Sequence, residues 1–178
     1  MFATFLGFLG IKTLVITDLD CASSSEHYKS KSFSEADTTT NATIKYFLDK
    51  KKLEEIVATT NVHRTFSYVP ATSAWTVDEN GVLRIAFQSE ENGYQASSFE
   101  DAFICKNTQF LIDNKTDFTG LKNSSSLTAE NTDYYALAQG CINSKTSFAL
   151  DILLYGGDSQ EKWEIPLYIK EGLEWLAQ

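Results

Sequence analysis

The stretch Leu14-Val15-Ile16-Thr17-Asp18-Leu19-Asp20 decides the predicted fold, because a short apolar run ends here in two carboxylates. The aliphatic and β-branched residues 14–16 are typical of a buried strand in a parallel sheet. In a strand, residues i and i+2 project from one face, so we expect Asp18 and Asp20 to project together from its carboxyl end. Ligands of open α/β sheets bind at that end.

The two carboxylates predict a particular kind of ligand. Neighbouring carboxylates repel each other unless a cation lies between them, and hard oxygen ligands suit Mg²⁺ or Mn²⁺. Asp18 and Asp20 therefore indicate a divalent-metal site for phosphoryl-transfer chemistry. The alternative is structural, since an Asp-x-Asp at a strand end is also typical of a solvated turn or a helix cap.

Composition limits the class of protein. The 178 residues, 43% hydrophobic and 13% aromatic, predict a single folded domain over 1–178 with a sizeable core. The net charge of −9 argues against a simple DNA-binding module, which normally carries a basic face. It argues less against a metal nuclease, because bound cations and the basic surfaces of other domains can hold the phosphates.

Cysteines and apolar runs bear on redox state and location. The three cysteines, Cys21, Cys105 and Cys141, lie far apart and lack a Cys-x-x-Cys pair, so we expect buried, reduced thiols rather than a zinc site. The apolar start lacks the basic leading region of a signal peptide, and no run reaches transmembrane length. The chain is predicted to be cytoplasmic, with no membrane partner.

The remaining pattern predicts an α/β fold in which a helix precedes the opening strand and ends at Gly10. Residues 21–40 read as a polar loop, and residues 113–130 as a polar connection. The turn signal Asp78-Glu79-Asn80-Gly81 predicts a β-hairpin between the two strands that flank it. The predicted helices are 42–49, 52–58, 98–107, 133–142, 145–154 and 165–176, and the predicted strands are 11–16, 65–69, 74–77 and 82–87.

Five segments, in order along nearly the whole chain, carry a family resemblance: Leu9–Asp20, Val82–Gln88, Ser97–Ile104, Ser144–Ala149 and Trp163–Leu176. Together they resemble the C-terminal part of the Toprim (topoisomerase–primase) nuclease domain of OLD-family endonucleases, which are ATPase–nuclease fusions of bacteria and phages. The resemblance implies a partial Toprim, Rossmann-like domain. Central parallel strands would be flanked by helices, with a β-hairpin insertion, a C-terminal helical portion and no first β-α unit.

The resemblance also implies roles for individual residues. Asp18 and Asp20 match the family's Asp-x-Asp and would bind a first divalent metal, Mg²⁺ or Mn²⁺. Glu100 would help bind a second metal, with Asp101 beside it as a further candidate. Lys145 would stabilise charge near the scissile phosphate. The implied mechanism is two-metal phosphodiester hydrolysis of DNA.

Two more residues and two structural alternatives belong beside these roles. Thr17 and Asn41 are candidates for residues that contact the metal ligands without binding the metal themselves. Glu100 and Asp101 also fit the first turn of a helix capped by Ser97 or Ser98, where acidic residues are favoured. Lys145 also fits an ordinary surface lysine.

The chain departs from the family pattern at three places. No glutamate in a Leu-Val-Glu-Gly-like strand precedes Asp18, Cys21 replaces a common serine, and Ala96-Ser97 replaces the usual Gly-Arg. We therefore expect little or no nuclease activity from this chain alone. The expected partners are DNA, an ATPase domain or upstream fragment that supplies the first Toprim strand, and a second copy of the chain at an exposed sheet edge.

Two other functions stay open. One is a non-catalytic Toprim remnant that binds a partner. The other is a phosphatase of the haloacid-dehalogenase type, in which Asp18 would be the nucleophile and Asp20 the general acid and base.

Overall fold

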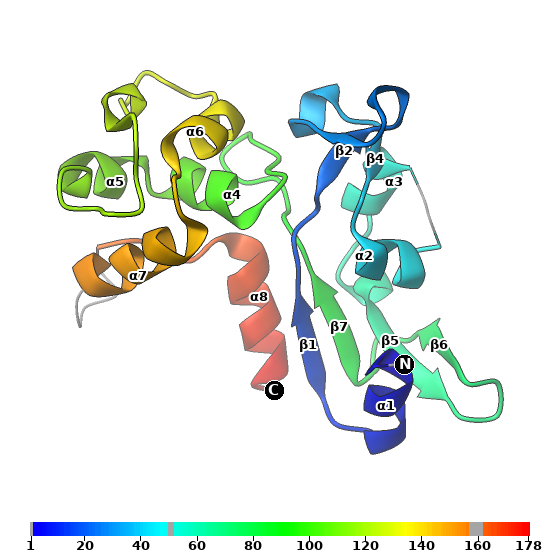
Figure 1. The fold of residues 1–178 in the computed structure, drawn as a ribbon. Helices are drawn as coiled ribbons and strands as arrows, with labels where there is room; N and C mark the ends of the chain where they lie inside the picture. Colours follow the sequence, from blue (N-terminus) through cyan, green and yellow to red (C-terminus); the bar gives the residue numbers. More distant parts are fainter. Residues whose placement is uncertain (1, 50–51, 157–161) are drawn as a thin grey trace. The chain divides into compact units, whose positions relative to one another are not determined.

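The apolar run that decides the predicted fold forms strand β1 (Thr13–Ile16) in a computed structural model that describes residues 2–49, 52–156 and 162–178 (Figure 1). β1 pairs in parallel with β7 (Leu83–Ala86), and Ile16 lies opposite Ala86 in the register. The mixed α/β class with a parallel pair in its central sheet is therefore confirmed. The sheet has the order β1-β7-β5-β6, with β5 at Thr65–Val69 and β6 at Ala74–Val77.

The predicted hairpin between β6 and β7 is wrong. β5 lies between these two strands and pairs antiparallel with both, so the hairpin is formed by β5 and β6. The turn itself is present, since Gly81 donates its N–H to the carbonyl of Asp78 at 2.9 Å. Asp78 also accepts a hydrogen bond from Ser67 of β5 at 2.7 Å, so the turn crosses the end of β5.

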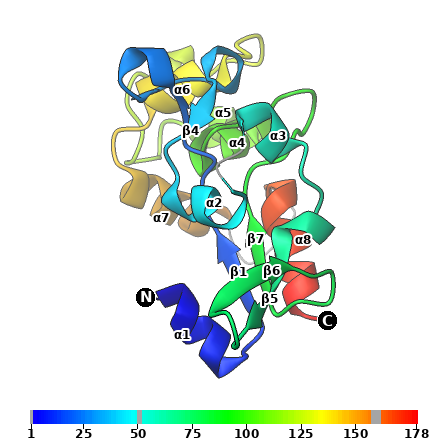
Figure 2. The same cartoon turned by 90° about the vertical axis from the view of Figure 1, so that its right-hand side faces the viewer.

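Helices cover this sheet on both sides (Figures 1 and 2). α8 (Leu167–Leu176) packs against β1 and β7, and its Trp175 ring carries two cations, Lys12 at 4.8 Å and Arg84 at 4.7 Å from the ring centroid. The other side holds α1 (Phe2–Leu9), α2 (Ala42–Phe47) and α3 (Leu53–Val57). α1 ends as predicted, because Gly10 adopts a left-handed conformation (φ 62°).

Residues 21–40 form a second, small sheet, so the predicted polar loop is wrong. Its strands β2 (Cys21–Ser23), β3 (Lys29–Ser30) and β4 (Thr38–Thr39) pair antiparallel in the order β3-β2-β4. The strands are too short to give a period-two pattern in the sequence. Single 3₁₀ turns connect them, η1 at Ser24–Glu26 and η2 at Phe33–Glu35.

The chain forms two compact units with separate cores. The sheet unit comprises Met1–Ser89 and Leu167–Gln178, and its core includes Ile44, Phe66 and Phe87. The helical unit comprises Glu90–Pro166. The predicted single domain over residues 1–178 stays a prediction.

The helical unit contains the other predicted helices at nearly their predicted bounds. Its helices are α4 (Phe99–Lys106), α5 (Thr108–Asn114), α6 (Tyr134–Cys141) and α7 (Lys145–Gly156). The sequence reading missed α5, which follows α4 after a single residue, Asn107. The side chain of Asn107 accepts a hydrogen bond from the N–H of Glu164 at 2.6 Å and donates one to the carbonyl of the same residue at 2.9 Å.

Two 3₁₀ turns complete the described elements, η3 (Val62–Arg64) and η4 (Ser124–Ser126). Among the described residues, no helix has the length and apolar character needed to cross a membrane. Cys21 and Cys141 are buried as predicted, and Cys105 is half-buried.

Candidate metal centre

The acidic loop that follows β1 is more irregular than the strand pattern suggests. β1 ends at Ile16, although the N–H of Thr17 still donates to the carbonyl of Ala86 at 3.0 Å. Asp18 is half-buried, whereas Asp20 is exposed in a left-handed conformation (φ 48°). The alternation of a strand therefore does not set the directions of these two side chains, and other contacts must hold them.

Gln88 holds the loop from the neighbouring strand. It lies two residues after β7 and is completely buried. Its side-chain oxygen accepts the N–H of Leu19 at 2.7 Å, and its Nε2 donates to Asp18 Oδ1 at 2.8 Å and to the hydroxyl of Tyr168 at 3.2 Å. One carboxylate oxygen of Asp18 is thus fixed by a residue from the adjacent parallel strand.

Asn41 holds the loop from the other side. Its Oδ1 caps α2 by accepting the N–H groups of Thr43 and Ile44 at 2.9 and 3.1 Å. Its Nδ2 then donates to Thr17 Oγ1 at 2.8 Å, to the carbonyl of Asp18 at 2.8 Å and to Asp20 Oδ2 at 3.2 Å. The structure therefore brings Thr17 and Asn41 together with both aspartates, and the cap of α2 orients the acidic loop.

The donors at this loop are all oxygens, which suits Mg²⁺ or Mn²⁺. Mg²⁺ commonly takes one or two carboxylates from the protein and completes its octahedron with water and substrate phosphates. Asp18 and Asp20 are two such carboxylates in the sheet unit, and their binding of a cation stays a prediction. In the part of the chain that the structure describes, no three or more His, Cys, Asp or Glu side chains gather where they would hold a metal ion.

Asp101 is a helix cap in the helical unit. The carboxylate is completely buried and accepts the N–H groups of Ser97 (2.9 Å) and Ser98 (2.7 Å), the Ser98 hydroxyl (2.7 Å) and the Tyr94 hydroxyl (2.9 Å). Ser98 is the N-cap of α4, and its side chain completes a capping box with Asp101. Burial, together with the adjacent charge of Asp101, raises the pKa of Tyr94 well above its ordinary value. The capping alternative for Asp101 is confirmed.

Glu100 and Lys145 lie together in the helical unit. Glu100 Oε1 accepts from the ammonium of Lys145 at 2.9 Å, while its Oε2 is buried with no hydrogen-bond partner among the described residues. Both side chains line a cavity of about 230 Å³ at the start of α4, the end of α6 and the start of α7. A buried carboxylate oxygen without a donor is costly unless a cation or water satisfies it, so this oxygen fits a metal ligand.

The predicted site residues therefore fall into two groups. Asp18 and Asp20 belong to the sheet unit, whereas Glu100, Asp101 and Lys145 belong to the helical unit. Each group is brought together locally. The convergence of both groups on shared metal ions stays a prediction.

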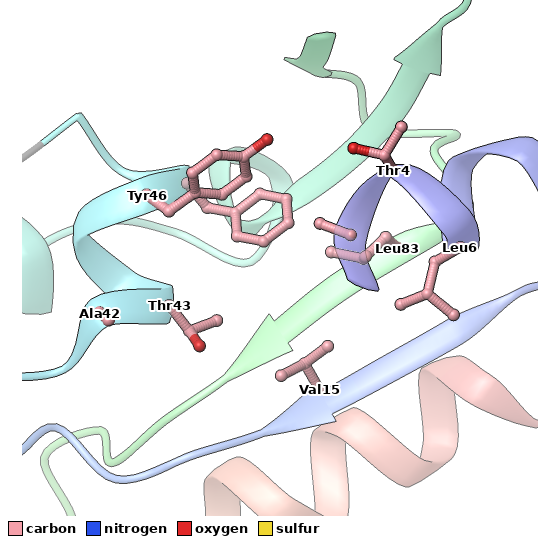
Figure 3. A pocket seen from close by; sticks show the side chains of 9 residues that line it. Thr4, Leu6, Val15, Ala42, Thr43, Tyr46 and Leu83 are labelled. Carbon is pink, nitrogen blue, oxygen red and sulfur yellow. The ribbon is translucent and has the colours of Figure 1, made fainter. Parts of the chain in front are cut away.

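A separate, apolar cavity of about 370 Å³ lies in the sheet unit (Figure 3). Leu6 of α1 and Val15 of β1 extend into it, and α2 contributes Thr43 and Tyr46. Val15 of β1 therefore lines the apolar cavity, and Asp18 follows after the end of the strand. This cavity has none of the carboxylates of the acidic loop in its lining.

Gln88 is the site residue that sequence reasoning missed. Gln88 closes one of the segments that resemble the Toprim family, and the resemblance implies no role for it. A signal was present, because Gln88 follows the apolar run of a second strand in the way that Asp18 follows the first. The carboxyl ends of parallel strands meet at one edge of a sheet, so the two side chains could have been predicted as neighbours.

Comparison with known proteins finds a similarity to an endonuclease. No protein-family model matches the chain, and no solved structure matches it significantly. The chain is similar to the endonuclease GajA of Bacillus cereus (strain HuB5-5), with 30% identity over 193 aligned residues. The alignment covers 96% of this chain and 24% of GajA, so the chain spans about a quarter of the length of that relative. An α/β protein with an acidic loop at a parallel strand end is thus distantly related to an endonuclease.

Proposed function

We propose that this chain is the C-terminal part of a Toprim-type nuclease domain of the OLD family, which hydrolyses phosphodiester bonds of DNA with Mg²⁺ or Mn²⁺. The observation that carries this proposal is the similarity to an endonuclease over 96% of the chain. The acidic loop supports it, because Gln88 and Asn41 hold Asp18 and Asp20 at the sheet edge where α/β proteins bind ligands.

Each acidic residue has a proposed task. Asp18 and Asp20 hold a first cation, and the buried, unpartnered Oε2 of Glu100 contributes to a second. When bound, the two cations activate a water molecule and stabilise the leaving oxygen. Asp101 is a weaker candidate for a ligand, because four hydrogen bonds to its carboxylate already serve the cap of α4.

Lys145 is proposed to stabilise the charge that develops on the phosphate. Its side chain is 71% exposed while its ammonium lies 2.9 Å from Glu100. An exposed lysine on a flexible stem can turn from the carboxylate to a phosphate oxygen, and a cation bound by Glu100 would then balance the charge of that buried carboxylate. The ion pair with Glu100 then keeps the lysine near the site in the absence of DNA.

The isolated chain is proposed to have little activity. It carries no counterpart of the glutamate on the first Toprim strand, which would leave the metal site short of one carboxylate. We propose that an ATPase-bearing partner or upstream segment supplies that strand, and that a second copy of the chain is a further partner. These proposals concern the whole protein. The relative, GajA, is about four times as long as its region that matches this chain.

A chimera tests this function. This chain replaces the aligned quarter of GajA, and cleavage of supercoiled plasmid DNA is followed with Mg²⁺ or Mn²⁺. We expect the chimera to cut and the chain alone to be nearly inactive. Asp18→Asn should abolish cutting by the chimera, whereas Asp113→Asn, a surface change on α5, should not.

Two outcomes would contradict the proposal. A folded chimera without cleavage would favour the non-catalytic remnant. Cleavage of a small phosphomonoester by the chain alone, sensitive to vanadate, would favour the phosphatase alternative.

A further inference from the structure

A second cavity of the sheet unit lies beside the small sheet. It has a volume of about 540 Å³ and a mostly polar lining. The lining residues come from the loops of the small sheet and from the start of α3: Ser24, Tyr28, Ala36, Asp37, Thr38, Lys52, Leu53 and Glu54.

Tyr28 presents an open aromatic ring to this cavity. The side chain is 58% exposed, which is unusual for a residue that prefers partial burial. Its backbone is left-handed (φ 59°), as is that of His27 (φ 55°), and its N–H donates to the carbonyl of Ser23 at 3.0 Å. A bulky residue rarely adopts this conformation, so the loop holds the ring outward at some cost.

A cation lies over the same ring. The ammonium of Lys45, on α2, is 5.5 Å from the centroid of the Tyr28 ring, within the range of a cation–π contact. The ring has two faces, and Lys45 occupies one of them. An aromatic face beside a lysine is the combination with which proteins bind single-stranded nucleic acid, because bases stack on the ring and the cation attracts the phosphates.

Charges of both signs lie at the cavity. Lys52, Asp37 and Glu54 line it, while Lys45 lies over the Tyr28 ring and Lys29 follows Tyr28 in the sequence. Of the acids near the cavity, Asp37 is engaged by the N–H and hydroxyl of Ser24, and Glu26 pairs with Lys31 at 2.8 Å. Lys52 adds positive charge in the lining, and Lys29, which follows Tyr28 directly, is also exposed.

The small sheet beside this cavity is joined to the acidic loop. β2 begins one residue after Asp20, and the hydroxyl of Thr39 in β4 donates to the carbonyl of Leu19 at 2.5 Å. The backbone N–H of Thr40 donates to the carbonyl of Asp20 at 3.0 Å. The small sheet therefore extends directly from the residues proposed to hold the first cation.

We propose that the cavity beside Tyr28 binds a nucleobase of single-stranded nucleic acid, with the base stacked on Tyr28 and the flanking phosphates against Lys45, Lys29 and Lys52. The inference rests on the proposed function, since the bound strand is the substrate of the nuclease. The Glu54 carboxylate in the lining can accept a hydrogen bond from an amino group of the base.

Fluorescence anisotropy of a short labelled oligonucleotide, in low-salt buffer with EDTA, tests the proposal on the full chain. We expect Tyr28→Ala to weaken binding of the single strand about tenfold, because the stacking of a base on one aromatic side chain changes affinity by about this order. Lys45→Gln should weaken it too, and Tyr28→Phe should keep most of the affinity. The measurement is made with DNA and with RNA of the same sequence, and the strand with the higher affinity is taken as the natural ligand.

Matched variants separate this site from general effects. Tyr46 is 59% exposed on the same unit, so Tyr46→Ala controls for loss of an exposed ring, and Lys170→Gln controls for loss of a charge. Both should leave affinity within about twofold of the wild type. The proposal is overturned if Tyr28→Ala and Lys45→Gln bind like these controls, or if Tyr28→Ala weakens duplex DNA as much as the single strand.

Failure of this site and failure of the nuclease can be told apart. The double variant Asp18→Asn/Asp20→Asn should bind the oligonucleotide in EDTA as the wild type does, because no metal takes part. Tyr28-dependent binding without cleavage by the GajA chimera would leave this inference standing and contradict the nuclease. Cleavage by the GajA chimera, with no effect of Tyr28→Ala on oligonucleotide binding, would support the nuclease and contradict this inference.

Discussion

Gln88 shows, at the residue scale, how the acidic loop depends on one buried amide. It is completely buried and bonded to Leu19, Asp18 and Tyr168. Gln88→Leu leaves the N–H of Leu19 without its acceptor, so we expect a loss of about 1–3 kcal/mol in the free energy of unfolding. Urea denaturation measures it, with the exposed Gln109→Leu as a control that should change stability by less than about 0.5 kcal/mol.

A charged variant at the same position adds a pH dependence. Gln88→Glu buries a carboxyl beside Asp18, and both burial and the like charge raise its pKa in the folded state. A group whose folded pKa is raised stabilises the fold at low pH and loses that contribution as the pH rises. The variant should therefore lose more stability relative to the wild type at about pH 8 than at about pH 5. Equal losses at both pH values would contradict the burial of a carboxyl at position 88 beside Asp18.

Variants of Asn41 separate its two roles, which are to cap α2 and to hold the acidic loop. Asn41→Ala removes both, and we expect a loss of about 1 kcal/mol in stability together with weaker Mn²⁺ binding in calorimetry. Asn41→Asp keeps an acceptor for Thr43 and Ile44 but removes the donors to the loop. It should restore the helix cap without restoring the original contacts to Thr17 and Asp20. If Asn41→Ala bound Mn²⁺ as tightly as the wild type, Asn41 would be a cap alone.

Tyr94 predicts a loss of stability in alkali. Its folded pKa is raised above the ordinary value of about 10, so its contribution is present below that pH and is lost as the pH rises further. Tyr94→Phe should destabilise the helical unit at about pH 8, where Asp101 loses a donor. The difference between wild type and variant should narrow above about pH 10 in urea denaturation. A constant difference would mean that the phenol titrates normally in the folded protein.

At the element scale, strand positions followed from the sequence but strand partners did not. The predicted bounds 65–69 and 74–77 are those of β5 and β6, because β-branched and aromatic residues between turn signals mark a strand locally. The turn at 78–81 is equally local. Which strands pair is decided by the whole core, and there β5, with Phe66, takes the central place beside β7.

Glycines at two elements predict opposite effects of one substitution. A Cβ on Gly81 would lie 2.3 Å from the backbone of Phe66, whereas at Gly140 in α6 nothing lies within 4 Å. Gly81→Ala should therefore destabilise strongly, since β5 and the turn must move apart. Gly140→Ala should stabilise by about 0.5–1 kcal/mol through helix propensity. Thermal unfolding of both variants checks this, and a Gly81→Ala protein as stable as the wild type would contradict the crossing of the turn over β5.

At the scale of the whole molecule, motif spacing predicts Asp18, Asp20, Glu100 and Lys145 as site residues but does not predict the contacts that hold them. Asp18 and Gln88 are 70 residues apart in sequence, and no local pattern reports their hydrogen bond. The pairing of Glu100 with Lys145 likewise depends on the packing of α4 against α7. Motif spacing identified chemically suitable side chains, whereas their partners follow from tertiary structure.

Paramagnetic broadening by Mn²⁺ tests most directly whether both halves serve one metal centre. The intensity of backbone amide signals is followed by NMR as substoichiometric Mn²⁺ is added. We predict broadening at Leu19 and Gln88 and also at Glu100 and Lys145, all of it lost in Asp18→Asn/Asp20→Asn. Broadening confined to the sheet unit, or unchanged in that double variant, would contradict a metal site shared by the two units.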